Sequence, residues 1–309
     1  MSEMIDPTVE APADPVITEK SDGKAMSKWT LYTRRFMRNK PAVGGIVIFV
    51  LLVLFAIFAP LIAKYDHIEL DFLNLGAPPS PEHWFGTTPS GNDTFAQVAI
   101  GLQRSLMIAV TVSVGTTVIS ALVGTAAAYF GGWTEKVTLT VIHFMMVIPS
   151  FLILSLLSNR SGGDWRVIAL IMIFVVGWYF PARVIWTTAL SLREREYIHA
   201  ARYMGVRGMT IVVRHLLPNI GSLLVINFTL GIVGAVMAET GLSFIGFGVK
   251  IPDVSLGSLI GSGANTITSA PWLFYFPAAA LTLLTVSMAL VADGLRDALD
   301  PTSAAGGRA

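Results

Sequence analysis

Few residues in this chain have the type and spacing that chemistry needs. The 309 residues include no cysteine and five scattered histidines, none of them in the HxxxH or HExxH spacing of a metal site. The one Gly-Lys pair, Gly23-Lys24, is followed by alanine, so the Gly-x-x-x-x-Gly-Lys-Ser/Thr loop that cradles nucleotide phosphates is missing. The net charge of +1 gives no support for a nucleic-acid partner. We therefore expect no catalytic residue, no metal site and no cofactor in this chain.

The most informative spacing lies in a charged segment, residues 193–218. The residues at i, i+3, i+4 and i+7 of a short predicted helix are Tyr197, Ala200, Ala201 and Met204. Two alanines followed by a glycine leave room for a partner backbone to approach closely, as small residues do at helix contacts. The pattern fits a short helix seated in a cleft of another protein. It also fits an interfacial helix that covers the end of a helix bundle, which is the commoner case on composition alone.

Composition places this segment in a membrane protein. Hydrophobic residues make up 53% of the chain, charged residues only 13%, and the mean hydropathy is +0.66, whereas about a quarter of a soluble domain is charged. A helix needs about 20 apolar residues to cross the hydrocarbon core. The segments of this kind are Ala42–Ala63, Ser105–Phe130, Val137–Leu157, Val167–Leu192, Ile220–Ala238 and Trp272–Ala292. The predicted fold is an all-α integral membrane protein with six transmembrane helices.

Lysine and arginine give the predicted bundle an orientation. If the N-terminus is cytoplasmic, sixteen of these cations fall on the inner side and five on the outer side. Cytoplasmic loops are enriched in them, so we expect both termini to be cytoplasmic. The expected parts are a largely disordered N-terminal tail 1–40, a first transmembrane helix 41–63, an extracytoplasmic loop 64–104, a core domain 105–300 and a C-terminal tail 301–309.

Three residues in or beside the apolar segments are candidates for lining a polar pathway. Glu239 follows the fifth segment, and an ionisable group there is costly and often functional. His143 and Pro149 lie within the third segment, and Pro149, like Pro181 in the fourth, predicts a kink. The simpler alternatives are an end-capping role for Glu239 and hydrogen-bonded packing for His143. The glycine-rich segment 240–271 either dips part-way into the membrane or forms an interfacial loop.

The charged segment continues with a longer pattern. Ala200-Ala201 is followed after three residues by Gly205, and after nine more by His215-Leu216-Leu217-Pro218. This spacing resembles the EAA loop of ATP-binding-cassette (ABC) importer permeases, which reads Glu-Ala-Ala, three residues, Gly, nine residues, Ile-x-Leu-Pro. His199 stands where that family has Glu, and His215 where it has Ile. The resemblance implies that an ATPase contacts this loop through Glu196, His199, Ala200, Ala201, Gly205, Leu217 and Pro218.

Three other stretches are similar to the C-type permease subunit of dipeptide, oligopeptide and nickel importers. They are Phe58–Ala63, Glu239–Gly248 and Asp293–Pro301, and the similarity covers nearly everything after residue 30. The outer loop departs from that family at Phe85-Gly86-Thr87-Thr88 and at Gly91-Asn92-Asp93, and His143 replaces a usual Asp. These departures concern the surface for a substrate-binding protein and the channel lining.

The resemblance implies a type I ABC importer permease, with a five-helix core, an N-terminal helix and a cytoplasmic coupling helix. Such a subunit lies in the plasma (inner) membrane of a prokaryote, in contact with lipid, and forms half of a translocation pathway with a second homologous permease subunit. Two separate ABC ATPase subunits would bind ATP and Mg, and an extracytoplasmic substrate-binding protein would deliver the substrate. Di- or oligopeptides are the leading substrates, with nickel or another small solute as the alternative.

An ion-coupled secondary transporter is the main alternative from another class. It would need buried carboxylates and often has repeated halves. Asp and Glu stand only at the ends of the predicted spans, and residues 42–157 show no repeat of residues 167–292. A membrane-embedded enzyme ranks behind it, because no nucleophile–base pair or set of metal ligands lies within the spans.

Overall fold

The computed structural model describes residues 28–175 and 177–299, and every statement on the fold refers to these. Regular structure is helical, and the β-type contact among the described residues is one bridge between Thr87 and Asp93. The helices long and apolar enough to cross a membrane are α2 (Lys40–Ile62), α3 (Thr94–Phe130), α11 (Gly221–Phe244) and α13 (Trp272–Leu299). Two bent helix pairs raise these four spans to six if each pair counts as one, as the sequence predicts.

The bends fall where the sequence predicts kinks. The bent pairs are α4 (Gly132–Val147) with α5 (Ser150–Arg160), and α6 (Trp165–Val175) with α7 (Tyr179–Arg193). The first pair meets at 81° and the second at 41°. Pro149 is the N-cap of α5, and the residue before a proline is kept out of the helical region, so α4 ends at Val147. Pro181 lies in the first turn of α7, where a missing N–H costs no helical hydrogen bond.

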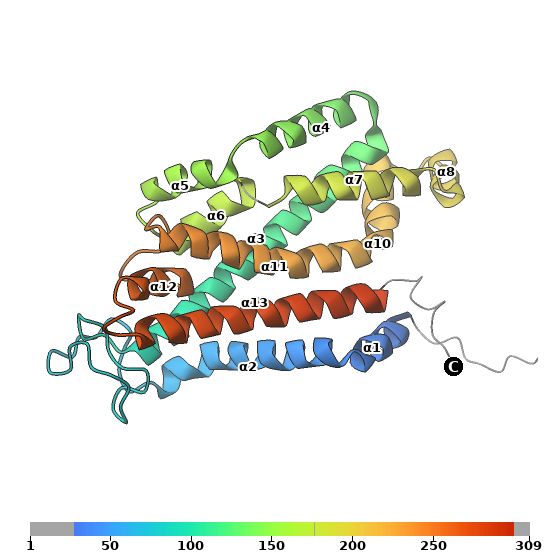
Figure 1. Cartoon of the computed structure of the whole chain (residues 1–309). Coiled ribbons are helices and arrows are strands. Elements are labelled where there is room, and N and C mark those ends of the chain that lie inside the picture. The colour runs from blue at the N-terminus through green and yellow to red at the C-terminus, as the bar shows by residue number, and fades with distance from the viewer. Residues whose placement is uncertain (1–27, 176, 300–309) are drawn as a thin grey trace, which may run out of the picture.

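Helix α3 crosses the bundle obliquely and packs against α7, α11, α2 and α6 (Figure 1). Its 37 residues correspond to a length of about 55 Å, well beyond the roughly 30 Å of a hydrocarbon core. It begins before the predicted span because Asp93 caps it, with Oδ1 accepting a hydrogen bond of 2.8 Å from the backbone N–H of Ala96. The predicted outer loop 64–104 is therefore shorter, and its last part belongs to α3.

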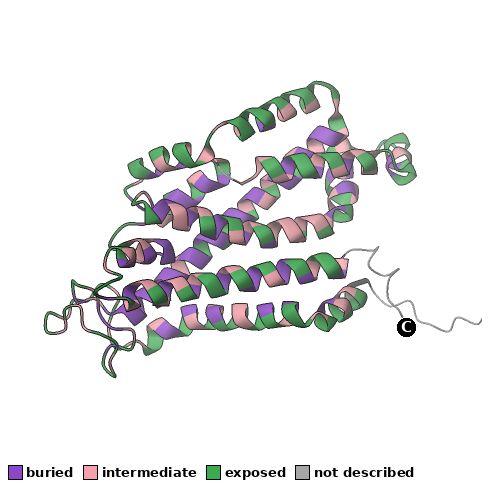
Figure 2. Ribbon diagram, in the orientation of Figure 1, coloured by how far each residue is buried: buried purple, intermediate pink, exposed green. Residues whose placement is uncertain are grey.

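The buried core lies between α3 and the helices around it. Its largest fully buried side chains include Leu102, Ile108, Met172, Leu242 and Leu284, from α3, α6, α11 and α13. In contrast, α4 and α5 lie at one edge of the bundle and are mainly exposed (Figure 2). Their exposed residues include Phe144, Val147, Phe151 and Leu152. An apolar surface of this kind requires lipid or a partner chain to cover it.

Two regions differ from their predicted boundaries. The first is the N-terminal tail: residues 1–27 lie outside the described residues, but Lys28–Arg38 forms α1, which packs on α13 and buries Phe36. The expected disorder therefore does not extend to residue 40. The second is the glycine-rich segment, which contains α12 (Leu256–Ala264), started by a capping box between Ser255 and Ser258. Since α12 packs against α13, α11 and α3, the part-way insertion is favoured over a simple interfacial loop.

Candidate functional site

The charged segment forms a helical unit at one end of the bundle. It consists of α8 (Glu196–Tyr203), α9 (Gly208–Ile211), the π-helical turn η1 (Val212–Leu216) and α10 (Leu217–Asn219). Helix α8 lies at the tip, beyond the ends of α7 and α11 (Figure 1). A short helix, a glycine break and a second helical piece are present as the sequence predicts.

A small apolar core of its own holds this unit together. Its buried members are Ile198, Ala201, Ile211, Val212 and Leu216. Tyr129 at the end of α3 and Leu192 at the end of α7 pack against it. Because the core joins α8 to both of these long helices, a force on α8 reaches them through packed side chains.

The Ala-x-x-x-Gly spacing, Ala201 to Gly205, corresponds to the hydrogen-bonded motif that ends α8. The backbone N–H of Val206 donates to the carbonyl of Ala201 at 3.1 Å, and that of Gly205 donates to the carbonyl of Arg202 at 3.0 Å. This pair of bonds is a Schellman motif, and Gly205 has the positive φ, +76°, that the motif places after a helix. Val206 also packs against the apolar cluster that contains Ala201, as the motif's usual apolar contact would place it. The glycine is therefore favoured by the local fold, whatever binds the loop.

The predicted common face of α8 divides in two. Ala201 is only 3% exposed and faces the chain's own core, whereas Ala200 is exposed. The surface available to a partner carries Tyr197, Tyr203 and Met204, of which Tyr203 is 89% exposed. The prediction that Tyr197, Ala200, Ala201 and Met204 share one contact face was therefore wrong for Ala201. A partner that docks here meets aromatic and methionine side chains around a single small residue.

The other predicted coupling residues lie around this surface. Glu196 is exposed in the first turn of α8, where a negative charge favours the helix. His199 Nε2 lies 3.7 Å from Glu194 Oε2, just before the helix. Leu217 is half-buried between two apolar clusters, and Pro218 is exposed in α10. The structure thus brings all seven predicted residues into one helical unit.

The candidate pathway residues do not form one site. Glu239 lies inside α11, five residues before its end, and its side chain is fully buried. Its prediction as a residue at the end of a span was wrong, because α11 continues to Phe244. His143 and Pro149 are exposed on α4 and at the α4–α5 bend. Neither contributes to the hydrogen bonds around Glu239.

Glu239 instead belongs to a cluster of serine hydroxyls. Ser243 Oγ donates to Glu239 Oε1 at 2.5 Å, and Ser255 Oγ donates to Ser243 Oγ at 3.3 Å. The backbone N–H of Leu256 donates to Ser105 Oγ at 3.1 Å, which ties the start of α12 to α3. The second carboxylate oxygen, Oε2, has no partner among the described residues. These contacts join α11, α12 and α3 at the end of the bundle opposite α8.

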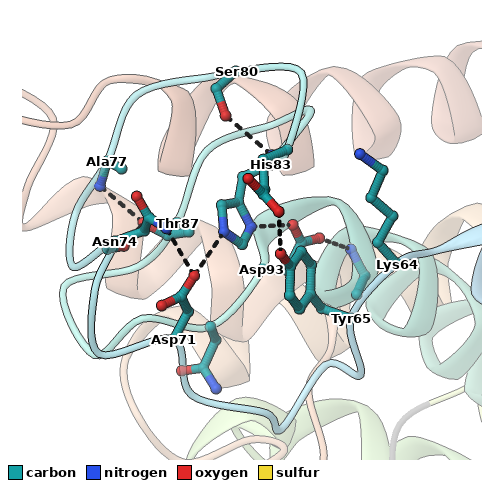
Figure 3. Close-up of polar contacts among 12 residues, drawn as sticks. Lys64, Tyr65, Asp71, Asn74, Ala77, Ser80, His83, Thr87 and Asp93 are labelled. Carbon is teal, nitrogen blue, oxygen red and sulfur yellow. Dashed lines mark hydrogen bonds and ion pairs between the residues drawn. The ribbon is translucent and has the colours of Figure 1, made fainter.

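A second polar cluster, in the loop before α3, was not predicted (Figure 3). His83 is 1% exposed, and its Nδ1 lies 2.8 Å from Asp93 Oδ2 while its Nε2 lies 3.2 Å from Asp71 Oδ2. The Asn74 side chain donates to Asp71 Oδ2 at 2.8 Å. This hydrogen bond and one from the backbone of Leu73, followed by the His83 contact, lower the pKa of Asp71. The imidazole therefore fastens the loop to the residue that caps α3.

Tyr65 covers this cluster. Its ring stacks on His83 with centroids 4.6 Å apart, and its hydroxyl donates to Glu82 Oε1 at 2.8 Å. The hydrogen bond to Glu82 is the main reason that the pKa of Tyr65 rises to about 12. The signal in the sequence was one histidine among several carboxylates in a loop, a pattern too common to be specific. Among the described residues, no group of histidines and carboxylates fits a metal ion.

Comparison with known proteins matches this architecture in two parts. Residues 118–304 match the family described as "Binding-protein-dependent transport system inner membrane component". Residues 27–79 match the "N-terminal TM domain of oligopeptide transport permease C". The first match contains the α8 unit and, from the cluster around Glu239, Ser243 and Ser255 but not Ser105.

Similar proteins span nearly the same length. An "Oligopeptide transport system permease protein OppC" of Mycobacterium tuberculosis (strain ATCC 25618 / H37Rv) is 43% identical over 278 residues, 90% of this chain and 96% of the relative. Proteins of the same name from Escherichia coli (strain K12) and Bacillus subtilis (strain 168) are 35% and 34% identical, each over 92% of this chain and 94% and 92% of their own lengths. The resemblance noted from the sequence is confirmed. The chain is a multi-pass membrane protein that belongs to the family of binding-protein-dependent transport system inner membrane components.

Proposed function

We propose that this chain is a transmembrane permease subunit of an ABC importer for di- or oligopeptides and forms half of the translocation pathway. The observation that carries the proposal is the α8 unit. It presents an exposed apolar face at the tip of the bundle, while its buried side connects to α3 and α7. The printed names of the relatives, oligopeptide permeases over most of their length, support peptides as the substrate class.

The proposal assigns the remaining work to partner chains. Two ABC ATPase subunits bind ATP and Mg and supply the energy, and one of them docks on α8, so this subunit is not itself catalytic. A second homologous permease subunit completes the pathway, and the exposed apolar surfaces of α4 and α5 offer area for it and for lipid. An extracytoplasmic substrate-binding protein delivers the peptide. The complex lies in the inner membrane of a prokaryote, with the α8 end and both termini in the cytoplasm.

One observation favours the alternative function, an ion-coupled secondary transporter. Glu239 is a buried carboxylate inside a helix long enough to span the membrane, whereas the sequence placed it at an end. Its oxygen Oε1 is engaged by Ser243, and the family is that of a binding-protein-dependent system. The ABC importer is therefore the better supported function.

Reconstitution in proteoliposomes tests the proposal. The chain, its permease partner, the ATPases and the binding protein are expected to take up a labelled tripeptide only when ATP is present on the ATPase side. Uptake should survive ionophores that collapse proton and sodium gradients. Competition with unlabelled dipeptides, longer peptides and a nickel chelate orders the substrate classes. Uptake that needs an ion gradient and proceeds without ATP would contradict the importer.

A further inference from the structure

A groove runs between the tip of α3 and the base of α8. It has a volume of about 680 Å³ and is lined by Tyr129, Phe130, Arg193, Glu194, His199 and Arg202, with nearby glycines. Arg202, which lines the groove, directly precedes Tyr203 and Met204, and both of these are exposed at the end of α8. The groove therefore belongs to the same end of the molecule as the proposed ATPase contact, on which the following inference rests.

The charges that line the groove are not balanced. Glu194 is its one carboxylate, and it accepts a hydrogen bond of 2.9 Å from Arg193 Nε. That bond is the main reason that the pKa of Glu194 is lowered, and His199 adds to the effect from 3.7 Å. Arg202 also contributes to lowering the pKa of Glu194, but it forms no ion pair within 4.0 Å with a carboxylate of the described residues. The lining of the groove thus contains two guanidinium groups and an imidazole with one carboxylate, and Glu135 lies beside it at Gly131.

The cations are held in place before any partner arrives. Arg193 Nη1 donates to the carbonyl of Ala128 at 2.8 Å, which anchors it to α3. The guanidinium of Arg202 lies over the Tyr129 ring, 5.2 Å from its centroid. Arginine presents a planar fork of N–H donors that matches a carboxylate in a bidentate pair. A preformed site of this kind loses little side-chain entropy when an anion binds.

We propose that this groove receives a carboxylate side chain of the docked ATPase subunit, which pairs with Arg202. The occupant is a protein and not a lipid headgroup because the groove lies beside α8, which extends past the ends of α7 and α11 (Figure 1). An ATPase that covers Tyr203 and Met204 also covers the mouth of the groove. The usual Glu of the EAA loop is His199 here, so the negative charge that the family carries at this position is absent. The ATPase is accordingly expected to contribute an anion where it faces His199 and Arg202.

Carbodiimide cross-linking tests the pair directly, because the reagent joins an amine to a touching carboxylate with loss of water. Arg202→Lys keeps the charge and supplies an amine in the assembled complex with both permeases and both ATPases. We expect a cross-link, absent from the wild type, from Lys at this position to an Asp or Glu of the ATPase. The matched control is Arg207→Lys, an exposed cation of the same loop that does not line the groove. It should give no comparable product.

A charge reversal gives the second measurement. Arg202→Glu should weaken ATPase binding about tenfold at low salt and less at high salt, since a surface ion pair is screened. Arg207→Glu should change it less than twofold. The inference is overturned if the ATPases bind the Arg202→Glu complex normally and the Arg202→Lys complex gives no new cross-link. It is also overturned if the defect appears only in nanodiscs with phosphatidylglycerol and disappears in phosphatidylcholine, which would identify a lipid headgroup. Failure of the wild-type chain to bind any ATPase would instead contradict the proposed function.

Discussion

Ser243 Oγ donates a hydrogen bond of 2.5 Å to Glu239 Oε1, one helical turn away on α11, and both side chains are buried. The contact matters beyond α11 because Ser243 Oγ also accepts from the backbone N–H of Val249 at 3.2 Å and from Ser255 Oγ at 3.3 Å. The carboxylate is thus the end of a chain of hydrogen bonds that fixes the segment after α11. Its position favours a role in holding helices together over direct contact with a transported molecule.

Replacing Glu239 separates these two roles. Glu239→Gln keeps the size of the side chain and an oxygen that accepts from Ser243, so we expect near-normal abundance and transport. Glu239→Ala leaves the Ser243 O–H without its acceptor and opens a cavity, which should cost about 1–3 kcal/mol and lower transport with abundance. Thermal stability in detergent and ATP-driven peptide uptake are the measurements. Loss of uptake in the Gln variant at normal stability would show that the charge itself is needed.

A side chain at position 205 would have room, but the backbone conformation of Gly205 is one that residues other than glycine rarely adopt. A Cβ at this position meets no atom within 4 Å, whereas φ is +76°. Gly205→Ala should therefore destabilise the end of α8 by about 1–2 kcal/mol, and Gly205→Asn by less, because asparagine adopts positive φ more readily. We expect ATPase binding to fall in that order, and Gly205→Glu to abolish transport while the chain still inserts.

Gly162 provides the control for this series. It also has a positive φ, +71°, with nothing within 4 Å of an added Cβ, but it lies between α5 and α6. Gly162→Ala should cost similar stability and leave ATPase binding unchanged. Equal binding defects at the two glycines would show that strain in general, and not the α8 unit, causes the loss.

The loop before α3 is predicted to loosen in acid. The pKa of Asp71 is lowered by its hydrogen bonds, so its ionised form stabilises the folded loop. That stability is present above the ordinary aspartate pKa of about 4 and is lost as the pH falls below it. Since the chain has no cysteine, Leu73→Cys, at a 94% exposed site, gives a single spin-labelling position in the loop. The label should be immobile down to about pH 4 and mobile below.

Asp71→Asn is the matching variant for this measurement. It removes the titrating group and one partner of His83, so the label should already be more mobile at pH 7 and respond less to acid. His83→Ala should give a larger increase, because it releases both Asp71 and Asp93. A label that is equally immobile at pH 7 in the parent protein, Asp71→Asn and His83→Ala would contradict the role of His83 in fastening the loop.

The bend between α4 and α5 is predicted to depend on Pro149. In Pro149→Ala the residue before it is free to become helical, so α4 and α5 should straighten from their 81° bend. A pair of spin labels on exposed residues of the two helices, Val141→Cys and Leu156→Cys, should then move apart. The same pair with Pro218→Ala, a proline in α10 that lies outside this bend, should keep its distance. An unchanged distance in Pro149→Ala would assign the bend to tertiary packing.

The long apolar helices and their kinks were predictable because hydrophobic length and proline act locally. The position of the α8 unit was predictable, but the orientation of α8 about its axis was not. The sequence cannot tell which of Ala200 and Ala201 contacts the chain's own core. The position of Glu239 was misjudged because a carboxylate normally ends an apolar span, whereas here Ser243 donates to Glu239 and is itself held by Ser255 from a later segment. His83 was missed because its partners, Asp71 and Asp93, are 12 and 10 residues away in a loop without periodicity.

Helix α3 connects the two ends of the subunit as one continuous rod. This rod begins at Asp93, which His83 holds in the loop before α3, and near its other end the Ala128 carbonyl accepts from Arg193 beside α8. Because the 37 residues run without a break, a tilt imposed at one end must swing the other in the opposite direction about the packed middle. A movement of α8 would thus be transmitted along α3 to the loop before it, with no break in the helix between the two ends. The α8 unit and the His83 cluster therefore lie at opposite ends of one continuous helix, which couples their movements.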